Sequence, residues 1–198
     1  MAREETGRQS HIFILSAPSG AGKNTLIKAL LREVPCLWHS VSCTTRPPRP
    51  GEREGEEYYF LSEKAFREKV SSGEFAEWAK VHGHLYGTSA RRLEEMRARG
   101  FDVVLDIDVQ GARQLKARYP EAVTIFIMPP SIEALRKRLR GRRGDAEDEI
   151  ERRLKVARAE IEERDFFEHV IANDNFEDAL RELKAIFLAK RGEPFRGS

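Results

Sequence analysis

The chain of 198 residues suits one compact domain, alone or with small insertions, and can bury a substantial apolar core. Charged residues make up 34% of the chain but nearly cancel, to a formal net charge of +2, which argues against a general nucleic-acid-binding protein. No apolar run approaches membrane-spanning length, and Cys36 and Cys43 lack the spacing of a metal site, so we expect a cytoplasmic protein with neither membrane nor nucleic-acid partners.

The first predicted elements surround a glycine-rich loop. An apolar run, Ile12–Leu15, predicts a strand, and a helix-forming segment follows over Leu26–Arg32. Between them, glycines would let backbone N–H groups approach a polyanion, the start of the helix would add partial positive charge, and Lys23 would reach the β- and γ-phosphates of a nucleotide. This order of elements predicts a phosphate-binding loop and disfavours a glycine-rich turn without a ligand.

The loop departs from the pattern G-x-x-x-x-G-K-[ST] at Ala17 and Asn24. Ala17 stands where the first glycine is expected, and Asn24 stands where a serine or threonine hydroxyl normally contacts Mg²⁺. The amide carbonyl of Asn24 is also a hard oxygen ligand, although its side chain is longer and bulkier. Thr25 is one residue further on and is expected to point elsewhere.

Short strands and turn residues are typical of the next region, about residues 37–88, which we interpret as a small insertion. The prolines between residues 47 and 50 exclude a helix interior or a central strand there, so Arg46 and Arg49 are expected on an exposed loop. The expected elements are strands over Trp38–Thr44 and Tyr58–Phe60, a helix over Glu63–Ser71, a strand over Phe75–Val81 and a turn over 84–86, between Gly83 and Gly87.

From Ser89 onward, predicted helices and strands alternate. The expected helices cover residues 89–99, 110–119, 131–140, about 146–166 and 176–190, and the expected strands cover 102–108, 123–128 and 169–173. The strand over 102–108 is apolar and ends in Asp106 and Asp108, which is typical of a buried parallel strand whose carboxyl end meets a ligand. This alternation predicts an α/β fold with a doubly wound, mainly parallel sheet flanked by helices.

Five segments in chain order together resemble guanylate kinase, a P-loop nucleoside monophosphate kinase. They cover residues 16–25, 41–52, 86–88, 106–111 and 138–142, and the resemblance extends from about Ile12 to Lys190. It implies a P-loop core over 10–36, 89–140 and 155–190, a small mixed α+β GMP-binding insertion over 37–88 and a helical lid over 141–154. It also implies transfer of the γ-phosphoryl group of ATP to GMP, and to dGMP, with Mg²⁺ as cofactor, in purine nucleotide metabolism and GMP recycling. A monomer or a small homo-oligomer is expected.

The resemblance implies an ATP site built on the phosphate loop. Asn24, and Asp106 through water, are expected to contact Mg²⁺, although a sheet-end or helix-capping carboxylate is an alternative role for Asp106. Asn173 is expected near adenine, with a turn cap as an equal alternative. The residues assigned to phosphoryl transfer are Lys23, Arg138, Arg142 and Arg153. The residues assigned to ATP binding are Ala17, Pro18, Ser19, Gly20, Ala21, Gly22, Lys23, Asn24, Thr25 and Asn173.

The GMP site that the resemblance implies has a phosphate part and a guanine part. The phosphate would be held by charged and phenolic donors, from Arg46, Arg49, Tyr58 and Tyr86. The guanine would be held by carboxylates facing N1 and N2, from Glu77 and Asp108, and by hydroxyls near O6, from Ser42 and Thr88. A wrong base would leave these groups unpaired, at a cost of about 1–3 kcal/mol for each. Without the resemblance, core packing of the tyrosines and solvated loop arginines would be the simpler interpretation.

Two functions of other kinds stay open at this point. Guanylate-kinase-like domains also act as non-catalytic binding modules, and Asn24 is the one feature of the sequence that favours this alternative. A related kinase that phosphorylates ribose 1,5-bisphosphate would not need the guanine-binding residues, which are all present. Discrimination among phosphoryl acceptors would separate these alternatives.

Overall fold

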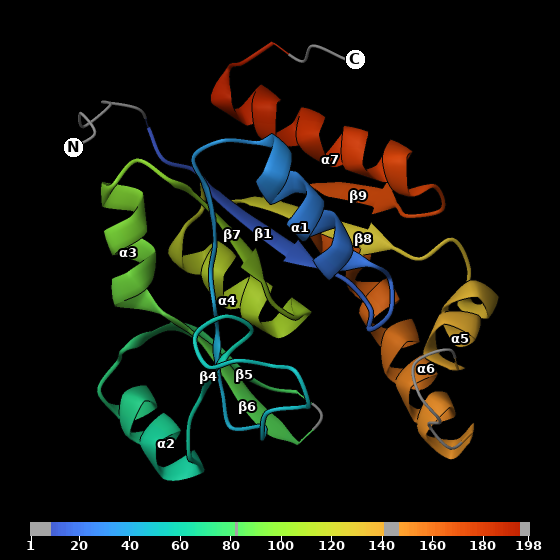
Figure 1. Ribbon diagram of the computed structural model, residues 1–198, viewed down its shortest axis with the longest axis horizontal. Coiled ribbons are helices and arrows are strands. Elements are labelled where there is room, and N and C mark those ends of the chain that lie inside the picture. The colour runs from blue at the N-terminus through green and yellow to red at the C-terminus, as the bar shows by residue number, and fades with distance from the viewer. Residues whose placement is uncertain (1–8, 82, 141–146, 195–198) are drawn as a thin grey trace. The chain divides into compact units, whose positions relative to one another are not determined.

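The computed structural model describes residues 9–81, 83–140 and 147–194, and the chain divides into two compact units (Figure 1). The first unit comprises Met1–Phe13 and Cys36–Ala122, and the second comprises Ile14–Pro35 and Val123–Ser198. Strand β1, Ile12–Ser16, is buried along its whole length and contributes residues to both units. No helix of the described ranges is long and apolar enough to cross a membrane.

Parallel strands form one part of the first unit. Strand β2, Leu37–His39, pairs in parallel with β7, Asp102–Asp106, and Leu37 lies opposite Asp102. On the other side of β7, the Val103 N–H donates to the His11 carbonyl at 2.9 Å, so the strand order in this unit is β2-β7-β1. Helix α3, Ala90–Ala98, packs on β7, and the hydroxyl of its N-cap residue Ser89 accepts from the Arg92 N–H.

A second, mixed sheet completes the first unit. Its order is β4-β3-β6-β5, formed by Tyr59–Phe60, Cys43–Thr44, His84–Ser89 and Phe75–Val81. Helix α2, Glu63–Ser71, covers one face of this sheet through a cluster in which its Phe66 meets Cys43, Phe75 and Leu85. The ring centroids of Phe66 and Phe75 are 4.5 Å apart. These aromatic contacts anchor α2 to the sheet.

The predicted strand over Trp38–Thr44 is wrong as a single element. The Ser40 N–H still donates to the Val104 carbonyl beside β2, but Cys43 and Thr44 pair with β6 and β4 in the second sheet. The predicted turn at 84–86 is also wrong, because these residues belong to β6. Gly87 lies inside this strand, where an added Cβ would lie 3.1 Å from Phe66 and from Phe75.

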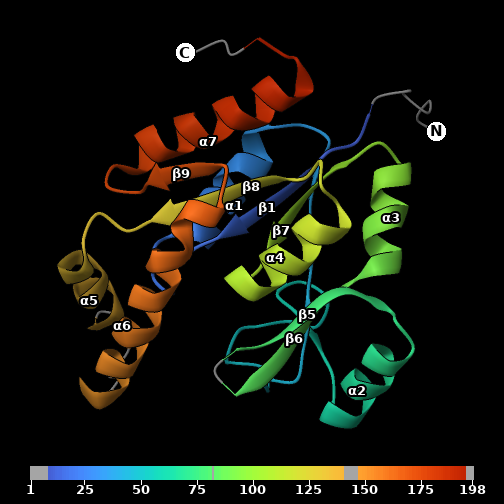
Figure 2. The same ribbon diagram turned by 180° about the vertical axis from the view of Figure 1, so that it is seen from behind.

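Helix α4, Val109–Arg118, lies beside β5 in the first unit (Figure 2). The predicted strand over 102–108 ends at Asp106, and Asp108 instead caps α4 by accepting from the Gly111 N–H at 2.8 Å. Gln114 ties the helix to the strand, since its side-chain amide donates to the Trp78 carbonyl at 2.8 Å and accepts from the Trp78 N–H at 3.2 Å. Asp108 is thereby held close to β5.

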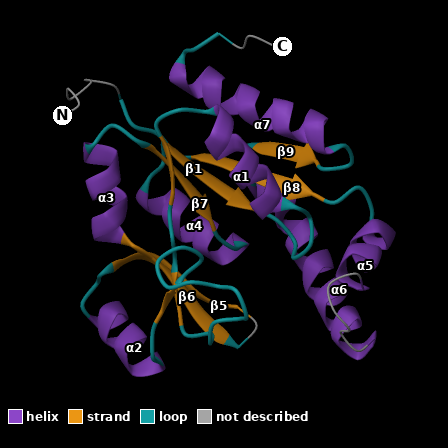
Figure 3. Cartoon of the chain, in the orientation of Figure 1, coloured by secondary structure: helices purple, strands orange, loops and turns teal. Residues whose placement is uncertain are grey.

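The second unit repeats the strand-and-helix pattern (Figure 3). Strand β8, Val123–Met128, pairs in parallel with β9, His169–Ala172, in the order β1-β8-β9. Helices α1, Lys23–Glu33, and α7, Phe176–Arg191, lie side by side, and Lys184 pairs with Glu33 at 3.0 Å. Parallel strands flanked by helices confirm the predicted α/β class.

Two further helices of the second unit pack on each other. Helix α5, Ile132–Arg140, and helix α6, Glu147–Glu162, share a core that includes Leu139 and Leu154. Glu147 accepts hydrogen bonds from Arg136 at 2.9 Å and from Arg140 at 2.6 Å. The predicted helix over about 146–166 ends in a short 3-10 helix, η1, at Glu163–Phe166.

Candidate active site

The glycine-rich loop of the second unit has the backbone expected of a phosphate-binding loop. Gly20 and Gly22 both have φ of +96°, a conformation that disfavours any residue with a Cβ. The turn is closed by the Ala21 N–H, which donates to the Pro18 carbonyl at 3.0 Å. Helix α1 then starts at Lys23 with no side-chain cap and no acidic residue in its first turn. The partial positive charge at this helix start is therefore not offset by a neighbouring carboxylate from the same turn.

Asn173 and Arg138 both form hydrogen bonds to this loop. The Asn173 Nδ2 donates to the Ala21 carbonyl at 2.6 Å, Arg138 Nη1 donates to the same oxygen at 3.3 Å, and Arg138 Nη2 donates to the Asn173 carbonyl at 3.3 Å. An added Cβ on Gly22 would collide with Asn173 Nδ2. We call these contacts among Ala21, Arg138 and Asn173 the loop clasp. Residue 173 does not cap α7, because Asn175 does so.

The residues expected around Mg²⁺ supply few protein ligands. Asn24 is exposed in the first turn of α1, and Asp106 ends β7 in the other unit. Within the described ranges, no three or more His, Cys, Asp or Glu side chains are grouped to hold a metal ion. Magnesium in kinase sites takes one or two protein oxygens and fills its shell with water and substrate phosphates, so the Asn24 carbonyl suits this role.

The remaining arginines expected at the reacting phosphoryl group differ in what the structure shows of them. Arg153 lies on α6, where its Nε pairs with Glu149 at 3.5 Å. Arg142 lies outside the described residues. Arg138 lies against the phosphate loop, where it donates to the Ala21 carbonyl.

Three of the residues expected to bind guanine come together on or next to strands of the mixed sheet. Glu77 on β5 is opposite Thr88 on β6, and the Thr88 hydroxyl donates to the Glu77 carboxylate at 2.6 Å. Cys43 is opposite Gly87 in the next strand pair, a register that places Ser42 next to Thr88. Ser42, Glu77 and Thr88 are all buried. One acceptor and two hydroxyls are thus gathered away from bulk water.

Burial changes the acidity of Glu77. The side chain is 4% exposed, and this loss of water raises its pKa to about 7. The hydrogen bond from Thr88 acts in the opposite direction, and the nearby charge of Asp108 raises the pKa further. In the free protein, the ionised and protonated forms of this carboxyl therefore have similar populations near neutral pH.

Gly111 allows Glu77 and Asp108 to lie close together, a role that the sequence analysis missed. An added Cβ at this position of α4 would lie 2.5 Å from Glu77 Oε2 and 3.2 Å from Asp108 Oδ1. The glycine thus leaves room for the Glu77 carboxylate against the start of α4. The available signal was a glycine inside a predicted helix, which usually has a packing or functional reason.

The residues expected at the GMP phosphate lie around Arg46 in the first unit. Both terminal nitrogens of Arg46 donate to the Glu52 carboxylate, each at 2.9 Å, and the Arg49 N–H donates to the same carboxylate at 2.7 Å. This pairing raises the pKa of Arg46 and lowers the pKa of Glu52. Glu52 belongs to a recognised motif, yet its contact with Arg46 was not anticipated.

Two tyrosines flank Arg46. Its guanidinium carbon lies 5.3 Å from the Tyr58 ring centroid, and the rings of Tyr58 and Tyr86 are 5.8 Å apart. Burial, together with the charge of Asp106, raises the pKa of Tyr58 to about 12, so its hydroxyl stays a neutral donor at physiological pH. Arg46, Tyr58 and Tyr86 are therefore brought together as expected, whereas the Arg49 side chain is exposed.

Comparison with known proteins shows the family of the chain. A family model described as guanylate kinase matches residues 9–190. A guanylate kinase from Geobacter metallireducens is 54% identical over 96% of this chain and 93% of its own length, and one from Geobacter sulfurreducens is 52% identical over 93% and 91%. The crystal structure of guanylate kinase from Anaplasma phagocytophilum matches with a TM-score of 0.77 and 34% identity, covering 95% of this chain and 89% of that one. The chain therefore belongs to the guanylate kinase family.

Proposed function

We propose that this chain is an active guanylate kinase, which transfers the γ-phosphoryl group of ATP to GMP and also accepts dGMP. The observation that carries the proposal is the buried pair of Glu77 and Thr88, with Ser42 beside it and Asp108 at the adjacent helix start. A hydrogen-bonded carboxylate and two hydroxyls complement guanine and would leave unpaired groups against adenine. The curated guanylate kinases at 54% and 52% identity support the same activity.

ATP is proposed to bind in the second unit. Residues 17–25 would surround its phosphates through backbone N–H groups, with Lys23 between the β- and γ-phosphates. Asn173 has a double role in this proposal, because its amide nitrogen donates to the Ala21 carbonyl and its side chain would also contact adenine. Mg²⁺ held by Asn24 would supply charge neutralisation at the β- and γ-phosphates, and the role of Asp106 as a ligand through water stays a prediction.

GMP is proposed to bind in the first unit. Its phosphate would meet Arg46, Arg49, Tyr58 and Tyr86, and Glu52 would orient Arg46 through the paired hydrogen bonds already present. Its guanine would meet Glu77, Asp108, Ser42 and Thr88. The two ends of GMP would thus be recognised differently. Charged donors would bind the phosphate, and buried acceptors would bind the base.

Phosphoryl transfer mainly requires the protein to position the reacting groups and to neutralise their charge. Charge spreads over the phosphoryl oxygens in the transition state, so arginines contribute more than an early proton acceptor would. Arg138, Arg142 and Arg153 are proposed for this task, and an arginine so placed is worth roughly 10³–10⁵ in rate. The proposal includes a lid over 141–154, an insertion over 37–88 and a core over 10–36, 89–140 and 155–190. It also includes a cytoplasmic location and a monomeric or small homo-oligomeric state.

A coupled assay of ADP release tests the proposal. ATP and Mg²⁺ are combined in parallel with GMP, dGMP, AMP, CMP, UMP or ribose 1,5-bisphosphate. Turnover confined to GMP and dGMP is the expected result, because only guanine pairs with the buried acceptors. Turnover with the sugar bisphosphate alone, or no turnover in a folded protein, would overturn the proposal in favour of the sugar kinase or the binding module.

A further inference from the structure

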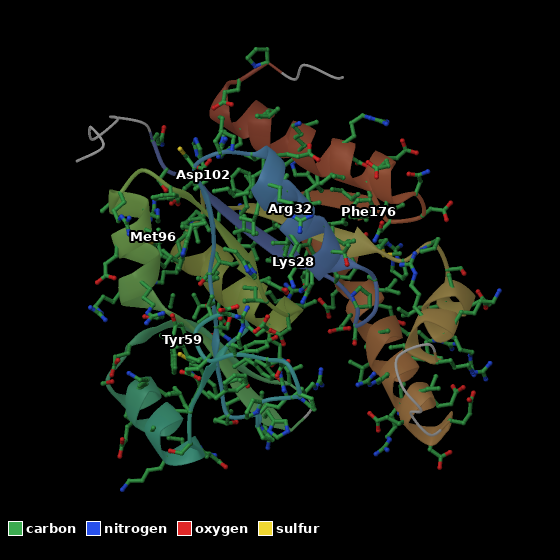
Figure 4. All side chains as sticks on the ribbon, in the orientation of Figure 1. Lys28, Arg32, Tyr59, Met96, Asp102 and Phe176 are labelled. Atoms are coloured by element: carbon green, nitrogen blue, oxygen red, sulfur yellow. The ribbon has the colours of Figure 1, made fainter. Side chains whose placement is uncertain are left out.

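The first unit contains a cavity of about 360 Å³ that none of the nucleotide-binding residues lines. Its walls come from α2 at Lys69, from α3 at Arg92, and from the mixed sheet at Cys43 and Tyr59. Figure 4 labels Tyr59, which lies between the ribbons of α2 and α3. Because all of these residues belong to one unit, the cavity is defined within that unit.

The cavity lies on the opposite face of the mixed sheet from the proposed GMP site. Successive residues of an extended chain point to opposite faces, so Tyr58 and Tyr59 diverge. Tyr58 contacts Tyr86 at the proposed phosphate site. Tyr59, in contrast, packs against the cluster of Cys43, Phe66 and Phe75 under α2. A molecule in the cavity would therefore not occupy the GMP site.

The floor of the cavity is apolar. It is formed by Cys43, Leu61, Phe75 and the ring of Tyr59. Burial raises the pKa of the Cys43 thiol, which keeps this group neutral. The floor therefore suits a hydrocarbon ring or short chain.

The rim of the cavity carries an arginine whose charge is not neutralised by a contacting carboxylate. The Arg92 guanidinium lies 3.9 Å from the Tyr59 ring centroid, and within residues 9–81, 83–140 and 147–194 no acidic side chain pairs with it. The neighbouring cations differ, since Lys69 pairs with Glu74 at 2.7 Å and Arg91 pairs with Glu95 at 3.0 Å. A guanidinium stacked by its face on an aromatic ring keeps its N–H edge available for an oxyanion in its plane.

We propose that this cavity binds a small amphipathic oxyanion, with one carboxylate, sulfonate or phosphate group on Arg92 and an apolar ring or short chain on the floor. Its volume falls within the range of about 300–1,000 Å³ that is usual for small-molecule pockets. Helix α3 has no acidic residue in its first turn, so its N-terminal dipole also favours an anion at this rim.

The probe for the test is 1-anilinonaphthalene-8-sulfonate, an aromatic sulfonate whose fluorescence rises on transfer to an apolar site. The full chain is titrated with GMP and ADP present at saturation, so that both nucleotide sites are filled. Saturable binding at one site is expected. N-phenyl-1-naphthylamine, which has the same rings without the sulfonate, is expected to bind at least about tenfold more weakly, because it cannot use the charged hydrogen bonds of Arg92.

Variants locate the probe. Arg92→Gln is expected to raise the Kd of the sulfonate at least about tenfold, and Arg92→Lys, which keeps the charge but not the planar fork, several-fold. Arg99→Gln is the matched control, because Arg99 also lies over an aromatic ring, 5.5 Å from the Phe101 centroid, but outside the cavity. Its Kd is expected to change less than about twofold. Turnover of GMP close to that of the unaltered chain verifies that each variant is folded.

Two results would overturn the proposal. If the sulfonate binds to the chain alone but not in the presence of saturating GMP and ADP, the probe occupies a nucleotide site. Equal Kd values for the unaltered chain, Arg92→Gln and Arg92→Lys would show that Arg92 does not contact the anion.

Discussion

The raised pKa of Glu77 predicts that GMP binding depends steeply on pH. Guanine presents donors at N1 and N2, so bound GMP requires the ionised carboxylate, whereas burial favours the protonated form in the free protein. With a pKa of about 7, roughly nine-tenths of this carboxyl is ionised at pH 8 and roughly one-tenth at pH 6. The Kd of GMP is therefore expected to rise about tenfold from pH 8 to pH 6, which corresponds to about 1.4 kcal/mol.

Isothermal titration calorimetry in buffers of different ionisation enthalpy measures both the Kd and the number of protons released. At pH 6, GMP binding is expected to release about 0.9 proton from Glu77, in addition to protons from the nucleotide phosphate, whose second pKa is about 6. Glu77→Gln is the matched control, because it keeps the size of the side chain and cannot titrate. Its proton release and pH dependence should come from the phosphate alone.

A substitution of Thr88 tests the direction in which its hydrogen bond shifts the pKa of Glu77. Its hydroxyl donates to the Glu77 carboxylate and lowers the pKa of that group, so Thr88→Val should move the midpoint of the Kd profile to higher pH. The reasoning is refuted if Glu77→Gln and the unaltered chain show the same pH dependence and the same proton release. Glu77 would then be ionised over the whole range despite its burial.

Three other substitutions test particular contacts by steady-state kinetics. Gly111→Ala should raise the KM of GMP at least about tenfold and leave that of ATP nearly unchanged, because the new methyl group would lie 2.5 Å from Glu77 Oε2; equal changes would contradict this. Asn173→Ala removes a hydrogen bond to the Ala21 carbonyl that is worth about 1 kcal/mol, so the KM of ATP should rise about fivefold. An unaltered KM would show that the loop clasp does not contribute to ATP binding. Asn24→Ser should lower the Mg²⁺ concentration that gives half-maximal rate, and superimposable Mg²⁺ titrations would show that the amide has no special role.

Elements with clear local signals could be predicted from the sequence. The helix over Glu63–Ser71 has the predicted bounds, and Ser62 caps its start while Gly73 follows its end in a left-handed conformation. The segment over Trp38–Thr44 could not be predicted in the same way. Its residues alternate as a strand does, but its two ends find partners in different sheets, and that choice depends on distant strands.

The residue types of the candidate site could be predicted better than their contacts. The motif around Arg46 pointed to phosphate binding, yet the paired hydrogen bonds to Glu52 depend on the turn that the intervening loop adopts. The place of Gly111 depends on how closely α4 approaches β5, which no local pattern encodes. In both cases the missing information is tertiary, because the partner lies across a loop or on another element.

The loop clasp also bears on how the growing chain acquires its ATP site. Asn173 and Ala21 are 152 positions apart in the sequence, so the phosphate loop leaves the ribosome long before its partner has been made. Contacts of such long range close late in folding, because the entropy of the intervening chain opposes them. A nascent or truncated chain that stops before β9 can form α1 locally but has no amide to brace the Ala21 carbonyl. Tight ATP binding is therefore expected only after synthesis has passed the last strand, β9.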